Sequence, residues 1–138
     1  LVAVVASGLA IAYLPAASPA SATAPTALNA EPFSETRLAA LRAEGRPVFV
    51  YFTADWCLTC KVNERVAIEK PSVEAAFKAG NVAVLVGDWT RNDPAIGRFL
   101  EAQGRSGVPL YLYYAKGGAA VVLPQVLTPA TLTDLVNN

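Results

Sequence analysis

The sequence contains no histidine and no methionine, and only two cysteines occur among its 138 residues. Without histidine, the chain lacks the commonest metal ligand, the usual general base and the usual protonation switch near neutral pH. Its eleven basic and eleven acidic residues cancel, so the charge indicates neither a nucleic-acid partner nor an acidic tail. Any chemistry must therefore come from thiols, carboxylates or the backbone.

The beginning of the chain lacks charge altogether, because the first charged residue is Glu31. Residues 1–14 form an apolar run, and residues 15–30 are rich in Ala, Ser, Pro and Thr without periodicity, as in a flexible linker. The run is shorter than the roughly 20 residues that cross a bilayer, so we interpret it as the end of a transmembrane helix. The alternative is the apolar part of a signal peptide with "SATA" as a cleavage site. Both interpretations place a domain of residues 31–138 outside the cytoplasm.

From residue 31 onward, helix and strand signals alternate. Strands that are joined through helices predict a parallel pair, and two closely spaced strands near the end predict an antiparallel hairpin. We therefore expect an α/β domain with a mixed sheet of about four strands, covered by helices on both faces. The expected helices are residues 34–44, 57–69, 72–79, 94–103 and 129–136, and the expected strands are residues 48–53, 82–86, 110–115 and 119–123.

The two cysteines, Cys57 and Cys60, are three positions apart at the junction between the first expected strand and the helix that follows it. Free backbone N–H groups and the helix dipole stabilise a thiolate at a helix N-terminus, so the pKa of Cys57 should be low. Cys60 lies one turn further along the same helix face, within reach of a disulfide with Cys57. We predict that Cys57 is the nucleophile that attacks a partner's disulfide and that Cys60 resolves the mixed disulfide.

Other roles for two cysteines at this spacing remain as alternatives. Structural zinc needs two more Cys or His ligands, and the chain has none, so no zinc site is expected. A module that handles Cu(I) or another soft metal needs only two thiolates and stays open. Two inert buried thiols are the third alternative, although they would not require a position at a strand-to-helix junction.

The segments "FTADWCLTCK" and "GVPLYLYY" resemble the thioredoxin superfamily. "ADWCxxCK", "PSVEAAF", "NDP" and the apolar start resemble more narrowly the C-terminal periplasmic domain of the DsbD family of thiol:disulfide interchange proteins, or the related ScsB family. The resemblance implies a monomeric domain with a thioredoxin fold and no bound cofactor. An independent secreted thioredoxin-like reductase for cytochrome maturation is an alternative within the same class.

The resemblance also implies partners and a location. Cys57 and Cys60 would accept electrons from a membrane domain of the same protein and pass them to a periplasmic disulfide-bearing domain or protein. The domain would then lie on the periplasmic side of the bacterial inner membrane, tethered through its N-terminal segment. By the same resemblance, Trp56 flanks the active-site surface, and the Val108–Pro109 bond is cis in a loop whose backbone pairs with an extended partner segment.

One position departs from the family pattern. Tyr51 stands where such domains commonly carry a buried aspartate that handles the proton of the inner cysteine, and a phenol with a reference pKa of ~10 is a poor base near neutrality. Glu64, four residues beyond Cys60 on the same helix face, is therefore the candidate for proton transfer. The alternative for Glu64 is a solvated helix carboxylate. We expect Asp55 and Asp88, the other nearby acids, to be surface or loop residues.

Overall fold

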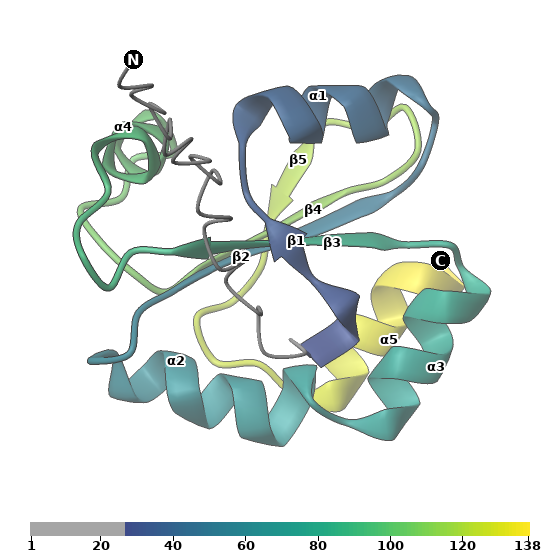
Figure 1. Cartoon of the computed structure of the whole chain (residues 1–138). Helices are drawn as coiled ribbons and strands as arrows, with labels where there is room; N and C mark the ends of the chain where they lie inside the picture. Colours follow the sequence, from purple (N-terminus) through teal and green to yellow (C-terminus); the bar gives the residue numbers. More distant parts are fainter. Residues whose placement is uncertain (1–26) are drawn as a thin grey trace, which may run out of the picture.

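The central strand of the sheet, β2 (Val48–Thr53), is buried at every position. The computed structural model describes residues 27–138, and within them β2 belongs to a five-stranded sheet with the order β1-β3-β2-β4-β5 (Figure 1). β2 pairs in parallel with β3 (Ala83–Asp88) and antiparallel with β4 (Leu110–Tyr114). β1 (Glu31–Pro32) extends the sheet beside β3, and β5 (Ala120–Val122) extends it beside β4. The predicted mixed sheet with a C-terminal hairpin is confirmed.

The expected number of strands, about four, is wrong by one because β1 was missed. β1 has only two residues, both exposed, and they pair in parallel with Leu85 and Val86 of β3. Glu31 and Pro32 form no apolar run that could indicate a strand. A proline is tolerated here because, within residues 27–138, β1 is the edge strand of the sheet.

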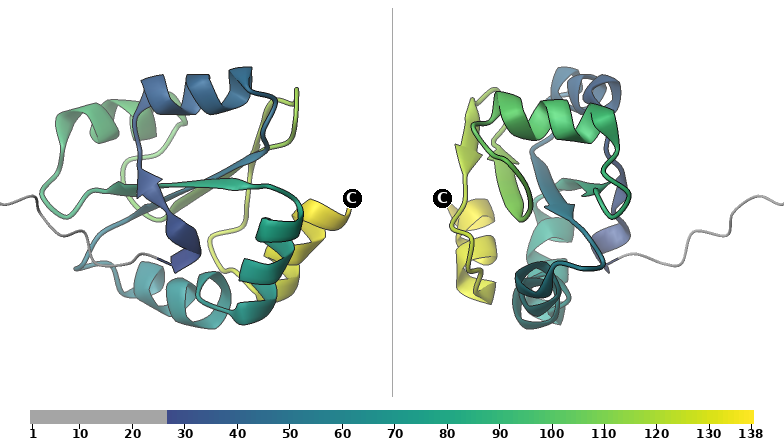
Figure 2. Two further views of the ribbon diagram at one scale, coloured as in Figure 1. Left: turned by 45° about the vertical axis from the view of Figure 1, so that its right-hand side comes forward. Right: turned by 90° about the vertical axis from the view of Figure 1, so that its left-hand side faces the viewer.

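Helices cover both faces of this sheet, as Figures 1 and 2 show from three directions. α1 and α4 lie on one face, and α2, α3 and α5 lie on the other. The predicted helix 57–69 is present, but its second half is a π turn, η2, closed by a hydrogen bond from Glu69 N to Glu64 O. The bounds are η1 (Ala27–Asn29), α1 (Glu35–Ala43), α2 (Leu58–Asn63), η2 (Glu64–Ile68), α3 (Pro71–Ala79), α4 (Pro94–Ala102) and α5 (Pro129–Asn137).

Alternate side chains of β2 enter the two halves of the core. Phe49 and Tyr51 pack on the side of α3 and α5, and Val48, Val50 and Phe52 pack on the side of α1 and α4. A strand covered on both faces needs apolar side chains at successive positions rather than at alternate ones. This requirement explains the unbroken apolar segment VFVYF and fixes where β2 ends.

The expected segments 1–14 and 15–30 lie for the most part outside the described residues. Of the described part, Ala27, Leu28 and Ala30 pack against the core on the side of α3 and α5. In residues 27–138, no helix combines the length and the apolar character that a membrane crossing requires.

A buried asparagine ties α2 to the other side of the domain. Asn63 is 2% exposed, and its Nδ2 donates to the Tyr111 hydroxyl at 2.9 Å and to the Gln125 carbonyl at 2.7 Å. Its Oδ1 accepts from Leu127 N at 3.0 Å. One side chain therefore joins α2, the helix that carries Cys60, to β4 and to the segment before α5.

Replacing this residue should destabilise the domain. We expect Asn63→Ala to lower the free energy of unfolding by about 2–3 kcal/mol, because buried backbone groups of the segment before α5 would lose their partner. Urea denaturation measures the change, and Asn138→Ala, which removes an exposed asparagine from the end of the chain, is the matched control. Equal stability of the two variants would contradict this role of Asn63.

Candidate active site

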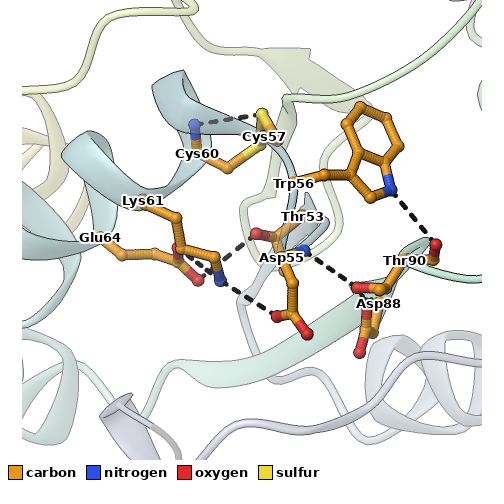
Figure 3. Close-up of polar contacts among 9 residues, drawn as sticks. All are labelled: Thr53, Asp55, Trp56, Cys57, Cys60, Lys61, Glu64, Asp88 and Thr90. Carbon is orange, nitrogen blue, oxygen red and sulfur yellow. Dashed lines mark hydrogen bonds and ion pairs between the residues drawn. A yellow bond between two sulfur atoms is a disulfide. The ribbon is translucent and has the colours of Figure 1, made fainter.

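The two cysteines form a disulfide where β2 gives way to α2 (Figure 3). Their Cα atoms are 5.3 Å apart. Cys57 is the N-cap of α2, and its Sγ accepts a hydrogen bond from Cys60 N at 3.2 Å. The predicted position of Cys57 at a strand-to-helix junction is confirmed. In the reduced protein, the same N–H group can donate to a thiolate on Cys57, which favours the charged form.

The two sulfur-bearing side chains differ in their access to solvent. Cys57 is 7% exposed and Cys60 is completely buried. Both pack against Ala54, with Val108 beside them. A partner can therefore reach Cys57 first, whereas Cys60 is accessible only from within the site.

The loop that precedes β4 closes one side of the dithiol. The Val108–Pro109 bond is cis, which is the geometry that the resemblance implied. Pro109 is buried, and Val108 is half-buried against the cysteines. The loop thus brings its backbone to the edge of the disulfide, where the expected pairing with an extended partner segment would take place.

Trp56 lies on the surface beside Cys57. Its side chain is 58% exposed, so simple core packing does not explain it. The indole Nε1 donates to the Thr90 carbonyl at 3.2 Å, and the ring lies 6.1 Å from the ring of Trp89 between centroids. The exposed indole is therefore held in one place although most of it faces solvent.

The segment that precedes Cys57 is bonded to the loop that follows β3. Asp55 N donates to Thr90 Oγ1 at 2.9 Å, and Thr90 N donates to Asp88 Oδ1 at 2.9 Å. Asp88 is exposed, as expected of a surface residue, but it orients Thr90. The pattern Asp-x-Thr at the end of a buried strand is typical of a side-chain-capped turn and could have indicated this loop.

Glu64 points toward Thr53 at the end of β2 and toward Lys61 (Figure 3). Its side chain is 14% exposed, so it is not the solvated helix carboxylate of the alternative interpretation. Its Oε1 accepts from the Thr53 hydroxyl at 3.4 Å, and its Oε2 lies 3.2 Å from Lys61 Nζ. Lys61 Nζ is also 3.7 Å from Asp55 Oδ1. The carboxylate is thus shared between a hydroxyl and an ammonium group, one turn beyond Cys60.

Tyr51 cannot take over the proton-handling role of the missing aspartate. Burial raises the pKa of the Tyr51 phenol well above its usual value of 10, and the negative charges of Glu64 and Glu69 raise it further. The phenol therefore stays protonated and uncharged across the range in which thiols ionise. Glu64 is left as the candidate for proton transfer.

The described residues offer no further ligand set for a metal. Within residues 27–138, His, Cys, Asp and Glu side chains do not gather in groups of three or more that could hold an ion.

Known sequences resemble this chain over the part that carries the site. A profile of the thioredoxin-like family matches residues 29–116. "Thiol:disulfide interchange protein DsbD 1" of Pseudomonas aeruginosa is 37% identical over 84 residues, which are 61% of this chain and 14% of that protein. The DsbD of Salmonella typhimurium is 33% identical over 101 residues, which are 71% of this chain and 18% of that protein. The chain thus spans only 14–18% of the length of these curated relatives.

Solved structures agree on the architecture. The C-terminal domain of Neisseria meningitidis DsbD in the oxidised form matches with a TM-score of 0.62 and 23% sequence identity, over 78% of this chain and 97% of that domain. A likeness at this identity shows the fold alone. The predicted thioredoxin fold is confirmed, and so is the resemblance to the DsbD C-terminal domain that the sequence motifs indicated.

If Glu64 handles the proton of Cys60, its charge should govern how the reduced thiols titrate. We expect Glu64→Gln to move the pH profile of iodoacetamide alkylation to lower pH, because a nearby carboxylate disfavours a thiolate. Tyr51→Phe is the matched control and should leave the midpoint in place, since the phenol is uncharged throughout this range. An unchanged midpoint in Glu64→Gln would exclude proton transfer by Glu64. A displaced midpoint in Tyr51→Phe would show that the Tyr51 phenol influences the titration of the thiols.

Proposed function

Since the chain belongs to the thioredoxin-like family, we propose that it is a protein dithiol–disulfide oxidoreductase that works as a reductase of protein disulfides. The observation that carries this proposal is the Cys57–Cys60 disulfide at the N-terminus of α2, with Cys57 slightly exposed, Cys60 completely buried and the Val108–Pro109 loop beside them. The names of the relatives, thiol:disulfide interchange proteins, support the same reaction class.

The reaction starts from the reduced protein. The Cys57 thiolate attacks one sulfur of the partner's disulfide, forms a mixed disulfide, and releases the other partner sulfur as a thiolate that takes up a proton. Cys60 then gives up its proton and attacks the Cys57 sulfur, which releases the second partner thiolate. Two electrons have moved to the partner, and the chain holds the Cys57–Cys60 disulfide. A dithiol donor restores the reduced form by the reverse exchange.

The burial of the two sulfurs supports this order of attack. Cys57 is the one that a partner can approach, and Cys60 reaches only Cys57. The proton that Cys60 loses needs an acceptor inside the site, and we assign the role of acceptor to Glu64. The Glu64 carboxylate lies one turn further along the helix and is largely shielded from solvent. Val108 and Trp56 border the accessible sulfur and would contact the bound partner segment.

We further propose that the domain is an intermediate carrier in a chain of electron transfer. Its electron donor would be a membrane domain of the same protein, and its acceptor would be a periplasmic disulfide-bearing domain or protein. The support is the similarity to DsbD proteins several times longer than this chain, together with the uncharged apolar run of residues 1–14. A domain tethered on the periplasmic side of the inner membrane meets its donor at a high effective concentration, which favours reduction.

A trapping experiment tests the order of attack. With dithiothreitol as donor and insulin as protein disulfide, we expect the full chain to accelerate insulin reduction. Cys60→Ser that has been reduced and then freed of dithiothreitol should accumulate a mixed disulfide with insulin, because the second step is blocked, whereas Cys57→Ser treated in the same way should form none. Non-reducing electrophoresis and mass spectrometry detect the adduct. Trapping by Cys57→Ser instead, or turnover that survives in it, would contradict the assignment of the nucleophile.

The proposed chain of electron transfer requires its own test. In cells that produce the full-length parent protein with Cys60→Ser, we expect the trapped disulfide to join Cys57 to a periplasmic disulfide-bearing domain or protein. Tight Cu(I) binding without any trapped partner would instead favour a soft-metal function.

A further inference from the structure

The loop that follows β3 meets the segment that precedes Cys57 at several bonded points (Figure 3). β2 and β3 run in parallel and end side by side, with Thr53 opposite Asp88. Trp89 N donates to the Thr53 carbonyl at 2.8 Å, so the two chains stay together one residue beyond the strands. The next residue, Thr90, then reaches across to the segment of Asp55 and Trp56.

Thr90 contacts that segment with two different atoms. Its Oγ1 accepts from Asp55 N at 2.9 Å, and its carbonyl accepts from Trp56 Nε1 at 3.2 Å. The hydroxyl hydrogen is already in use, because Thr90 Oγ1 donates to Asp88 Oδ1. A hydroxyl has a single hydrogen, so this bond leaves the oxygen with its lone pairs directed at Asp55 N. Asp88 thereby orients Thr90, and Thr90 fixes the backbone and the indole that come before the nucleophile.

The same loop also reaches the other wall of the site. The Trp89 ring lies beside Trp56, and a Cβ atom on Gly107 would lie only 3.4 Å from Trp89 Cζ3. Gly107 precedes Val108, which packs against the cysteines. Residues 88–90 therefore connect the segment before Cys57 to the loop of the cis proline.

We propose that Thr90, oriented by Asp88, is a positioning residue that holds Trp56 as a preformed contact surface for the protein partner. The inference rests on the proposed function and adds to it a determinant of partner selection. Trp56 is more than half exposed, and its indole is held by the bond from Nε1 to the Thr90 carbonyl and by the contact with the Trp89 ring. A contact surface that is already ordered loses less conformational entropy when a partner binds.

This role separates two kinds of substrate. A protein disulfide covers the surface around Cys57 and uses the ordered indole, whereas a small disulfide such as 5,5′-dithiobis(2-nitrobenzoate) needs only the thiolate. Thr90→Val keeps the shape of the side chain but has no hydroxyl to accept from Asp55 N or to donate to Asp88 Oδ1, while the bond from its backbone N to Asp88 stays. We expect it to slow insulin reduction by roughly threefold to tenfold, as for the loss of one or two hydrogen bonds, with an unchanged rate on the small disulfide.

Matched variants make the test specific. Thr90→Ser retains the hydroxyl and should restore insulin reduction, and Asp88→Ala should reproduce the selective defect of Thr90→Val because it frees the Thr90 hydroxyl. Thr133→Val removes a hydroxyl from α5 that bonds to the Ala130 carbonyl within the same helix, and should behave as the wild type. The melting temperature and the Cys57/Cys60 reduction potential should be measured on every variant. We expect both to stay at the wild-type values even in the variants that reduce insulin more slowly.

Each outcome has a definite consequence. A selective loss on insulin that Thr90→Ser restores supports the proposal. Equal losses on insulin and on the small disulfide, or a loss that follows the melting temperature, would overturn it in favour of a general structural role. An active wild type with an equally active Thr90→Val would overturn this inference alone, whereas a wild type that does not reduce insulin would contradict the proposed function as well.

Discussion

The burial of β2 on both faces is the constraint on which the site depends. Because helices cover both sides of the sheet, the strand must be apolar at successive positions, and it ends at Thr53, two residues before the exposed Asp55. The chain leaves the sheet there and enters α2 within a few residues, so Cys57 becomes the N-cap of a helix rather than an ordinary loop residue. The position of the thiol near free N–H groups therefore follows from the packing of the whole domain.

This packing also disfavours a carboxylate at the position of Tyr51 on the strand that leads to the dithiol. The face of β2 that carries Tyr51 packs against aromatic and aliphatic side chains, and the Phe49 and Tyr51 rings stack 5.8 Å apart between centroids. An ionised carboxylate at that position would lose its hydration without a charged partner in the core, which is costly. Glu64 lies at the rim instead, where Lys61 and Thr53 share its two oxygens. Moving the carboxylate from the strand to the helix keeps a negative group near Cys60 and leaves the interior apolar.

Much of the fold was predictable from the sequence because its signals are local. The apolar segment of β2, the spacing of Cys57 and Cys60, and the glycine-containing hairpin before β5 each follow from a short stretch of residues. β1 was missed since two exposed residues become a strand only when β3 is there to pair with them. In the site, Glu64 and the cysteines could be placed by helix periodicity, but the bonds from Thr90 to Asp55 and Trp56 join residues more than thirty positions apart. No local pattern encodes such a contact, although Asp88-x-Thr90 does indicate a turn.

Reaction and recognition are consequently carried by different parts of the domain. The position of the two thiols depends on the burial of β2 and on the geometry of α2. Both are fixed by the core and do not depend on the surface loops. The exposed surface around Cys57 depends on loop bonds that lie outside the core, beginning with the carbonyl of Thr53 and ending at the indole of Trp56. Exposed loops tolerate substitution better than packed strands. A domain of this kind can therefore change its partners by altering residues such as Thr90, while the dithiol that performs the exchange stays the same.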